Sequence, residues 1–462
     1  MDVCRLRFFV LLLTGAVLAA GAAAAGFPDH AGAEAPLSAP VPPGDPLASL
    51  LGHLTDPAET PPGPEPGQIA RPFPGGLPLG RSDLRERRST KHLAPGVTLT
   101  TIRRGNGKAK RARIADTRGG PWLVNVLTID PREADGRLTT TFGRTLAGLD
   151  RTTALIKRAD ALAGVNGSFF SLRADRRYPG LPVGLTIRDG RVLSKPTGTS
   201  QEVTLALDSE QNTLRIGQFI WSGNVRSRSG QGSMALDRLN SPPTVPRGCA
   251  RAKAAAKPRC AGSGQLAAFT SDFAGRTPAG PGVEIVLDSA GCPMRVVRHR
   301  GVKLRRAQTS LQGTGATAAR LRSLAAGGCV DTEHSVHNRY GWELPLRSGV
   351  SAVTGRFRLM RQGQIVLSDR GASIFGRNPR TIAGVDPDGK LMLVTIDGRQ
   401  PRSVGATLWE AARVARALGM WDAINLDGGG STAMAVRGHL VNRPAGSERS
   451  VSDALVWQAR KD

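Results

Sequence analysis

The sequence predicts an α+β fold, in which a twisted mixed β-sheet flanked by helices forms a single folded domain. Many short segments alternate apolar and polar residues, as expected for strands with one buried face. A few segments instead repeat apolar residues at helical spacing. Hydrophobic residues make up 40% of the 462-residue chain, which is enough to build a substantial core.

The chain begins with the features of an export signal. Two arginines precede an apolar run from Phe8 to Ala20, and small residues follow it. This run is too short for a comfortable membrane span, so we expect a signal peptide over residues 1–25, with an uncleaved anchor as the alternative. Residues 26–90 are rich in Pro, Gly and Ala and predict a disordered stalk. Residues 91–462 remain as the folded domain of a secreted, extracellular or cell-wall-associated protein.

The chain is strongly basic, with 63 Lys and Arg against 37 Asp and Glu. Much of this excess is Arg in a chain rich in Ala and Gly, a pattern that genomic base composition alone can produce. The functional interpretation is attraction to a polyanion such as nucleic acid, anionic lipid or a phosphate-containing polymer of the cell wall. Export weakens the nucleic-acid interpretation.

Four cysteines remain after the signal, an even number in an oxidising compartment. Their order favours disulfides Cys249–Cys260 and Cys292–Cys329, while two other pairings stay open. A zinc site is the alternative, although there is no CxxC pair and no suitable His spacing nearby. We therefore expect no metal.

Several elements are predicted individually. Residues 122–129 read as a strand, and residues 183–193 read as a hairpin that turns at Asp189-Gly190. Residues 406–418 place Leu408, Ala411, Ala415 and Leu418 near one helical face. Residues 423–427 then return as a strand.

The strongest motif lies at the end of that last strand and reads Asn425-Leu426-Asp427-Gly428-Gly429-Gly430-Ser431-Thr432. Three successive glycines allow backbone N–H groups to approach an oxygen-rich ligand, with Asp427 projecting into the same space. The alternative is a flexible turn after an ordinary strand. The loop lacks the Lys of a P-loop, which argues against nucleoside triphosphate binding.

Three further motifs carry polar groups next to predicted strands. Arg380, in 376–381, has a guanidinium suited to gripping phosphate, unless it is one more surface arginine. Asp397 is a second carboxylate at a strand end, although Asp-Gly is also common in turns. Asn166, in 164–170, follows a strand and is suited to bonding a sugar hydroxyl or carbonyl.

Together these motifs resemble the phosphodiester glycosidase family, and the resemblance covers residues from about His92 to Ala459. The matching segments are 164–170, 378–384, 397–398 with 408–411, 425–432 and the closing segment 449–456. Ser168 and Phe169 stand where relatives often have Gly and Tyr. The resemblance implies an active-site cleft formed by these motifs.

A sugar attached through phosphate leaves as a stable anion, so cations and oriented N–H groups can replace much of the acid that other glycosidases need. We hypothesise that Arg380 and the amides of Gly428–Gly430 hold the phosphate. One of Asp427 and Asp397 activates water or attacks the anomeric carbon, and the other orients the sugar or acts as acid. Asn166 and Asn425 bind sugar or loop backbone.

Ser431 and Thr432 complete the expected substrate-binding set, and no cofactor is expected. Glu410 is a candidate third catalytic carboxylate, although a solvated helix residue is the more ordinary interpretation.

The expected activity is hydrolysis of the glycosyl C–O bond in a sugar-1-phosphodiester. The alternatives are a non-catalytic binder of phosphate-containing wall polymer and a phosphodiesterase that cuts the P–O bond. The expected partner is an anionic sugar-phosphate or cell-wall polymer, with no nucleic acid and no stable membrane span after signal cleavage. The sequence leaves the sugar, the anomeric configuration and the oligomeric state open.

Overall fold

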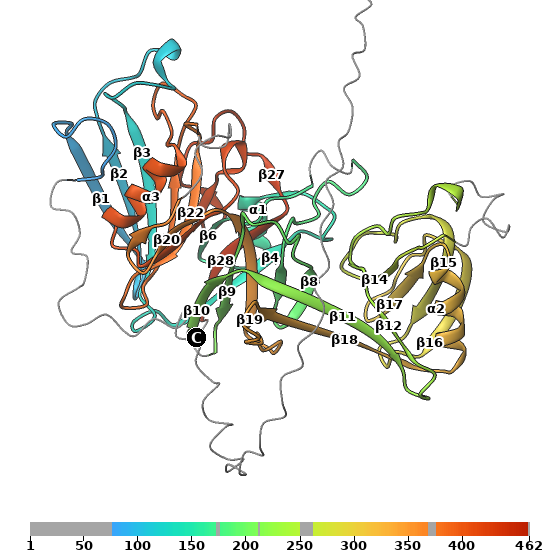
Figure 1. The fold of residues 1–462 in the computed structure, drawn as a ribbon. Helices are drawn as coiled ribbons and strands as arrows, with labels where there is room; N and C mark the ends of the chain where they lie inside the picture. The colour runs from blue at the N-terminus through green and yellow to red at the C-terminus, as the bar shows by residue number, and fades with distance from the viewer. Residues whose placement is uncertain (1–75, 172–175, 211–212, 250–261, 368–375, 461–462) are drawn as a thin grey trace, which may run out of the picture. The chain divides into compact units, whose positions relative to one another are not determined.

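A computed structural model describes residues 76–171, 176–210, 213–249, 262–367 and 376–460 (Figure 1). In these ranges the chain forms mostly β-strands, with three α-helices: α1 Thr152–Arg158, α2 Thr317–Ala326 and α3 Leu408–Ala417. Helix α3 lies within residues 406–418, where the sequence predicts a helix. None of the described helices combines the length and the apolar character needed to cross a bilayer. The predicted signal peptide lies outside the described residues.

The largest sheet has eight strands in the order β1-β2-β3-β23-β22-β24-β20-β21. Its strands are β1 Glu86–Ala94, β2 Val97–Arg104, β3 Trp122–Ile129, β20 Arg358–Arg361, β21 Gln364–Ile365, β22 Arg380–Val385, β23 Leu391–Ile396 and β24 Asp422–Asn425. Every pairing in it is antiparallel, in contrast to the mixed sheet expected. Neighbours joined by tight turns, such as β22 and β23, must run antiparallel, and the crossover through α3 returns β24 beside β22.

Two further groups of strands complete the part of the fold around the site. One five-stranded sheet has the order β26-β25-β6-β28-β4, and the other has the order β10-β9-β19-β7-β8. The first consists of β4 Gly136–Phe142, β6 Ala163–Asn166, β25 Met434–Val436, β26 His439–Leu440 and β28 Asp453–Ala459. The second consists of β7 Thr186–Arg188, β8 Arg191–Ser194, β9 Glu202–Asp208, β10 Thr213–Gly217 and β19 Val350–Arg356. A short pair joins β5 Asp150–Arg151 to β27 Ser450–Val451.

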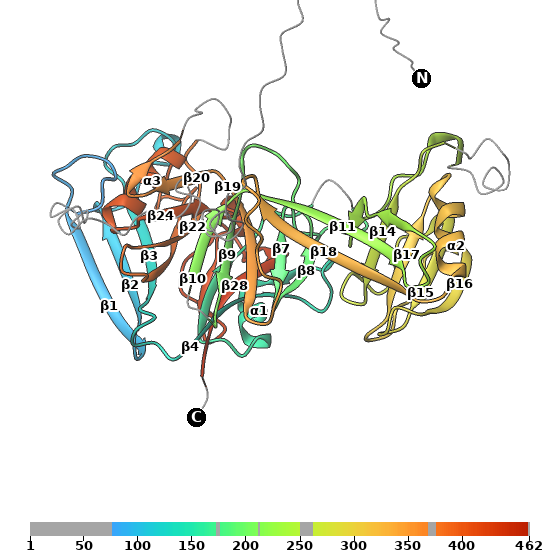
Figure 2. The ribbon, with the colours of Figure 1, turned by 60° about the horizontal axis from the view of Figure 1, so that its bottom comes forward.

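The remaining strands belong to the middle of the chain. The three-stranded sheet β12-β11-β18 consists of β11 Phe219–Ser227, β12 Ser233–Ala235 and β18 Val330–Asn338. The five-stranded sheet β13-β14-β17-β15-β16 consists of β13 Arg238–Leu239, β14 Leu266–Thr270, β15 Gly280–Leu287, β16 Pro293–Arg300 and β17 Thr309–Gly313. Only β13 and β14 pair in parallel among the described strands. Figures 1 and 2 both show α2 beside β15 and β16.

The predicted hairpin over 183–193 is confirmed in its central part. Strands β7 and β8 are joined at Asp189-Gly190, and both of these residues have positive φ, at 50° and 76°. This is the geometry of a type I′ turn, which matches the twist of a hairpin.

Both faces of the eight-stranded sheet are covered. On one face α3 packs through Leu408, Ala411 and Ala415 onto strand residues such as Ile382 and Val394. On the other face, residues of β3, β23 and β24 pack against the two five-stranded sheets that flank the site. Burial on both faces explains why the strand β23, Leu391–Ile396, is apolar almost throughout.

The folded part begins earlier than residue 91, the boundary that the sequence predicts. Leu77 and Leu79 are fully buried in the same core as α3, and β1 starts at Glu86. The buried Arg104 guanidinium donates to the Leu79 carbonyl at 2.8 Å and so anchors this segment. Two leucines in a Pro- and Gly-rich context were too weak a pattern to predict this.

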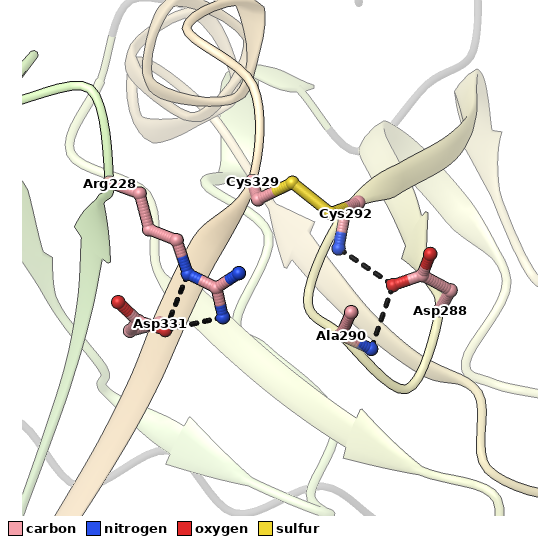
Figure 3. Close-up of a disulfide and its surroundings, with 6 residues drawn as sticks. All are labelled: Arg228, Asp288, Ala290, Cys292, Cys329 and Asp331. Atoms are coloured by element: carbon pink, nitrogen blue, oxygen red, sulfur yellow. Dashed lines mark hydrogen bonds and ion pairs between the residues drawn. A yellow bond between two sulfur atoms is a disulfide. The ribbon is translucent and has the colours of Figure 1, made fainter.

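The disulfide Cys292–Cys329 is confirmed, and it lies in the five-stranded sheet of the middle region (Figure 3). Cys292 directly precedes β16, and Cys329 follows α2. Asp288 shapes the turn before β16 by accepting the amides of Ala290 and Cys292, at 2.9 and 2.8 Å. The other predicted disulfide involves Cys260, which lies outside the described residues.

Replacement of both Cys292 and Cys329 by Ser is expected to lower the free energy of unfolding by about 4 kcal/mol, because the bond closes a loop with a sequence separation of 37. Denaturant unfolding of the double variant against the oxidised wild type measures this difference. An unchanged midpoint and slope would show that the bond adds nothing to stability.

Candidate functional site

The glycine motif forms a loop that is held between two sheets. After β24, the Leu426 amide donates to Thr381 O at 2.9 Å and the Asp427 amide donates to Gly167 O at 3.1 Å. Gly429 has φ of 63°, a conformation that favours glycine, and its amide donates to Pro379 O at 2.8 Å. The loop therefore touches the start of β22 and the end of β6, and the Gly429 amide is already engaged. The backbone of Gly428 also interacts with the Asp427 carboxyl.

Asn166 at the end of β6 fixes this arrangement. Its Nδ2 donates to Asp427 O at 2.7 Å, and its Oδ1 accepts from Thr381 Oγ1 at 2.8 Å and from the Ala433 amide at 3.1 Å. The side chain is fully buried. Asn166 therefore binds loop backbone, one of the two roles expected for it, rather than a sugar.

Asp427 lies beside a second carboxylate, Asp453, at the start of β28. Burial raises the pKa of Asp427 to about 6, and the nearby Asp453 raises it further while Arg449 lowers it. Burial likewise raises the pKa of Asp453 to about 6. Asp453 Oδ1 accepts the Ser168 amide at 2.6 Å, and its Oδ2 has no hydrogen-bond partner among the described residues.

No role is predicted for Asp453 from the sequence, although it lies in 449–456, the closing segment of the family resemblance. The available signal was a carboxylate at the start of the otherwise apolar strand Asp453–Ala459. Gly167 explains how Asp453 fits, since a Cβ at position 167 would collide with Asp453 Oδ1.

Asp397 lies at the end of β23 and is joined to the glycine loop through Asn442. Asn442 Nδ2 donates to Asp397 Oδ1 at 2.9 Å and to Thr432 O at 3.2 Å, while Asn442 Oδ1 accepts the Met434 amide. The Arg443 amide donates to Asp397 Oδ2 at 2.9 Å. Burial raises the pKa of Asp397 to about 6 despite these donors. Asn442 is a site residue that sequence reasoning missed, because nothing in its local pattern marks it.

Two exposed guanidinium groups cover the glycine loop. A Cβ on Gly430 would collide with the Arg449 guanidinium, and a Cβ on Gly429 would lie 3.1 Å from Arg399 Nη2. Arg399 is oriented by Asn378, whose Oδ1 accepts from Nε and Nη2 at 3.0 and 2.7 Å. Glycine at 429 and 430 therefore permits close approach of cations as well as of backbone.

Arg380 is placed differently from the expectation. It is only 2% exposed, and it donates from Nε to Ala406 O at 2.9 Å and from Nη2 to Gly376 O at 2.7 Å. Burial lowers the pKa of Arg380 to about 10. Its position in β22 brings its backbone next to Gly428, but its guanidinium ties together main-chain segments on the α3 side of the sheet. Arg399 and Arg449, not Arg380, are therefore the exposed cationic groups next to the glycine loop.

Glu410 is likewise held by structural contacts. Its carboxylate accepts from Arg377 Nη2 at 2.7 Å and from the Thr407 amide at 2.9 Å, while Thr407 Oγ1 accepts the Glu410 amide at 3.0 Å. This is a capping box at the start of α3, reinforced by an ion pair. The structure does not bring Glu410 into contact with Asp397 or Asp427.

The remaining expected residues line the loop with buried polar atoms. The side-chain amide of Asn425 and the hydroxyl of Thr432 are buried and have no hydrogen-bond partner among the described residues. Such groups are uncommon in proteins and retain capacity to bond a ligand. The buried Ser431 hydroxyl lies beside the Asp427 carboxyl, and its interaction lowers the pKa of that group. In the part of the chain that the structure describes, no three His, Cys, Asp or Glu side chains gather as metal ligands.

Glu410→Ala is expected to destabilise the fold by about 3 kcal/mol, because it removes the cap of α3 and leaves the mostly buried Arg377 without its partner. Denaturant unfolding measures the loss. Glu410→Gln retains an acceptor for the Thr407 amide and should cost less. If Glu410→Ala kept full stability but lost turnover, Glu410 would return to the catalytic set.

Asp453→Asn is expected to stabilise the protein at pH 8 and to leave its stability nearly unchanged at pH 4. The folded-state pKa of about 6 exceeds the usual value, so the stabilising contribution of Asp453 is present at low pH and is lost as pH rises through 6. Removing the charge should raise the unfolding free energy by about 1–3 kcal/mol at pH 8. Thermal unfolding at both pH values tests this, with the exposed Asp83→Asn as control. Equal shifts at pH 4 and pH 8 would refute the charge explanation.

Comparison with known proteins supports the family resemblance over part of the chain. Residues 267–457 match the family described as phosphodiester glycosidase. The SPbeta prophage-derived uncharacterized protein YomE of Bacillus subtilis is 40% identical over 81 residues, which are 17% of this chain and 13% of that protein. Mouse N-acetylglucosamine-1-phosphodiester alpha-N-acetylglucosaminidase is 32% identical over 115 residues, 22% of each chain.

The chain therefore spans less than a quarter of the length of either of these relatives. A crystal structure of a Burkholderia pseudomallei protein shares the fold more broadly, with a TM-score of 0.66 and 27% identity over 83% of this chain and 98% of that one. The matched region includes Asp397, the glycine loop, Asn442, Arg449 and Asp453, whereas Asn166 precedes it. The similarity to the phosphodiester glycosidase family therefore extends over residues 267–457 of this chain.

Proposed function

We propose that this protein is an exported hydrolase that releases a sugar from a phosphodiester by cleaving the glycosyl C–O bond. The observation that carries the proposal is the meeting of two kinds of group at the glycine loop. The carboxyl of Asp427 directly precedes the loop and interacts with that of Asp453 at the start of β28, and the exposed guanidiniums of Arg399 and Arg449 cover the loop. An anion-binding protein without catalysis has no need for carboxylates there, since they repel its ligand.

Asp427 is the residue to which we assign attack on the anomeric carbon or activation of water. Asp397 and Asp453 are each 1% exposed, whereas residue Asp427 keeps intermediate exposure, although burial of its carboxyl still raises its pKa. Both carboxylate oxygens of Asp397 also accept hydrogen bonds, from the Asn442 side chain and from the Arg443 amide. We therefore assign Asp397 to positioning of the loop, and Asp453 to tuning Asp427 or to proton transfer.

The leaving group explains the arginines. Cleavage of the C–O bond puts the bonding electron pair on a phosphate oxygen, and the product is an anion that is stable at neutral pH. Arg399 and Arg449 are placed to stabilise this charge as it develops. Oriented cations thereby replace the protonating acid of other glycosidases.

Export and the nature of the substrate belong to the same proposal. The N-terminal sequence has the pattern of a secretory signal, and the Cys292–Cys329 disulfide suits an oxidising compartment. An anionic sugar-phosphate or a phosphate-containing wall polymer agrees with the net charge of +26. The names of the mammalian relatives make N-acetylglucosamine the first sugar to try.

The test is incubation of the purified protein with N-acetylglucosamine-1-phosphodiesters in oxygen-18 water. Label in the released sugar is expected, because water then attacks carbon. Label in the phosphate would instead identify a phosphodiesterase. Binding without any sugar release, across a panel of sugars, would identify a non-catalytic binder.

Asp427→Asn is expected to lower kcat by about a thousandfold or more with the fold intact, because the attacking group is lost. The kcat/KM of the wild type should rise with pH through about 6, since Asp427 must be ionised and its pKa is raised to that value. Because Asp427 and Asp453 interact, the midpoint belongs to the pair. Steady-state kinetics from pH 4 to 8 measure both effects.

Arg399→Ala and Arg449→Ala serve as companion variants and should lose kcat/KM, whereas Arg113→Ala, an exposed arginine paired to Asp116, should not. Wild-type rates in Asp427→Asn would remove the catalytic assignment.

A further inference from the structure

The middle of the chain contains a long stretch without any acid. No Asp or Glu occurs between Asp288 and Asp331, although eight Lys and Arg residues do. One of them, Arg300, is buried and donates to Pro281 O and Gln312 Oε1. The other seven are exposed and come from β16, the turn after it and α2: Arg295, Arg298, Lys303, Arg305, Arg306, Arg320 and Arg322. We call these seven the basic face.

The basic face is not neutralised by its surroundings. The side chains of the seven make no ion pair or hydrogen bond with the described residues, and only the backbone amide of Arg305 donates to a side chain, Gln308 Oε1. Many other exposed arginines are paired, as in Arg81–Asp83 and Arg113–Asp116. The nearest acids in the sequence are engaged in other contacts, since Asp288 accepts backbone amides in a turn and Asp331 pairs with Arg228 (Figure 3). Genomic composition explains abundant arginine but does not explain this separation of charge.

The basic face rests on a rigid support. Strand β16 pairs with β15 on one side only and forms the edge of its sheet. The disulfide joins the residue before β16 to the third residue after α2, so the two elements are tied at one end. Arg295 and Arg298 project to opposite faces of β16, because successive side chains of a strand alternate, and both are exposed, so they flank the free edge of the sheet. The other five lie in the turn after β16 and on α2, so the cations are spread over three segments instead of gathered around one point.

We propose that the basic face is a docking surface for a linear polymer of phosphodiester-linked polyol or sugar units. This inference rests on the proposed function for the class of polymer, and it adds a second contact outside the glycine loop. Cations spread over several neighbouring segments suit repeated phosphates better than a single anion. Only Met294 and Val296 among the residues of β16 are exposed large apolar side chains, too little apolar area for a membrane-inserted surface.

The experiment measures binding of the oxidised protein to soluble poly(glycerol phosphate) as a function of salt. Arg295→Glu/Arg298→Glu is expected to weaken binding by about tenfold or more at low salt and to reduce the salt dependence. The control Arg81→Glu/Arg113→Glu changes net charge equally at exposed, paired arginines and should bind nearly as the wild type does. Both variants should hydrolyse a small sugar phosphodiester at the wild-type rate, so failure of the proposed function and failure of docking are seen separately.

Three outcomes would overturn the inference. Equal weakening in the control variant would show a general charge effect. Binding to phosphatidylglycerol vesicles but not to the soluble polymer would indicate a membrane surface, and preference for duplex DNA over the polymer would indicate a nucleic-acid surface. If the double Glu variant does not fold, Arg295→Gln/Arg298→Gln is measured in its place and must show weaker binding.

Discussion

The hydrogen bonds of Asn166 are the interaction on which the candidate site depends. One side chain joins the end of β6 to the Asp427 carbonyl, to Thr381 of β22 and to the chain after the glycine loop. These segments come from three separate parts of the sequence, and the loop itself has little side-chain volume with which to fix its position. The Asn166 side-chain amide is fully buried and both donates and accepts hydrogen bonds, so it can fix the position of the loop.

The same site contains buried carboxyl groups, whose ionised forms destabilise the folded state. Asp397, Asp427 and Asp453 each have a pKa raised to about 6 by burial, so at neutral pH the protein keeps three desolvated carboxylates in one region. The free energy lost by desolvating these carboxylates is offset by the apolar packing of the eight-stranded sheet against its neighbours. Strained or desolvated groups of this kind are typical of functional sites, because a reactive carboxylate must not be fully satisfied by the protein.

Local patterns predicted well those features whose cause is local. The helix α3, the Asp189-Gly190 turn and the loop after β24 each follow from spacing or turn chemistry, and Cys292–Cys329 follows from the order of the cysteines. The direction in which a polar side chain points is different, because it depends on which face of a sheet is buried by distant segments. Arg380 and Glu410 therefore have functional groups typical of active sites, but in this protein they make hydrogen bonds and an ion pair that hold the fold together. Asn442 and Asp453 reach the site only through pairings of strands far apart in sequence.

Charge is organised differently in the two regions that we assign to phosphate. At the glycine loop, Arg399 and Arg449 lie against glycines beside raised-pKa carboxyls, so positive and negative groups act on one small volume. On the basic face, seven cations stand without acids between Asp288 and Asp331. The first arrangement favours a charge that appears during a reaction, since fixed cations gain most where charge develops. The second favours charge that is already present along a polymer, and its strength must fall with salt because every contact there is exposed.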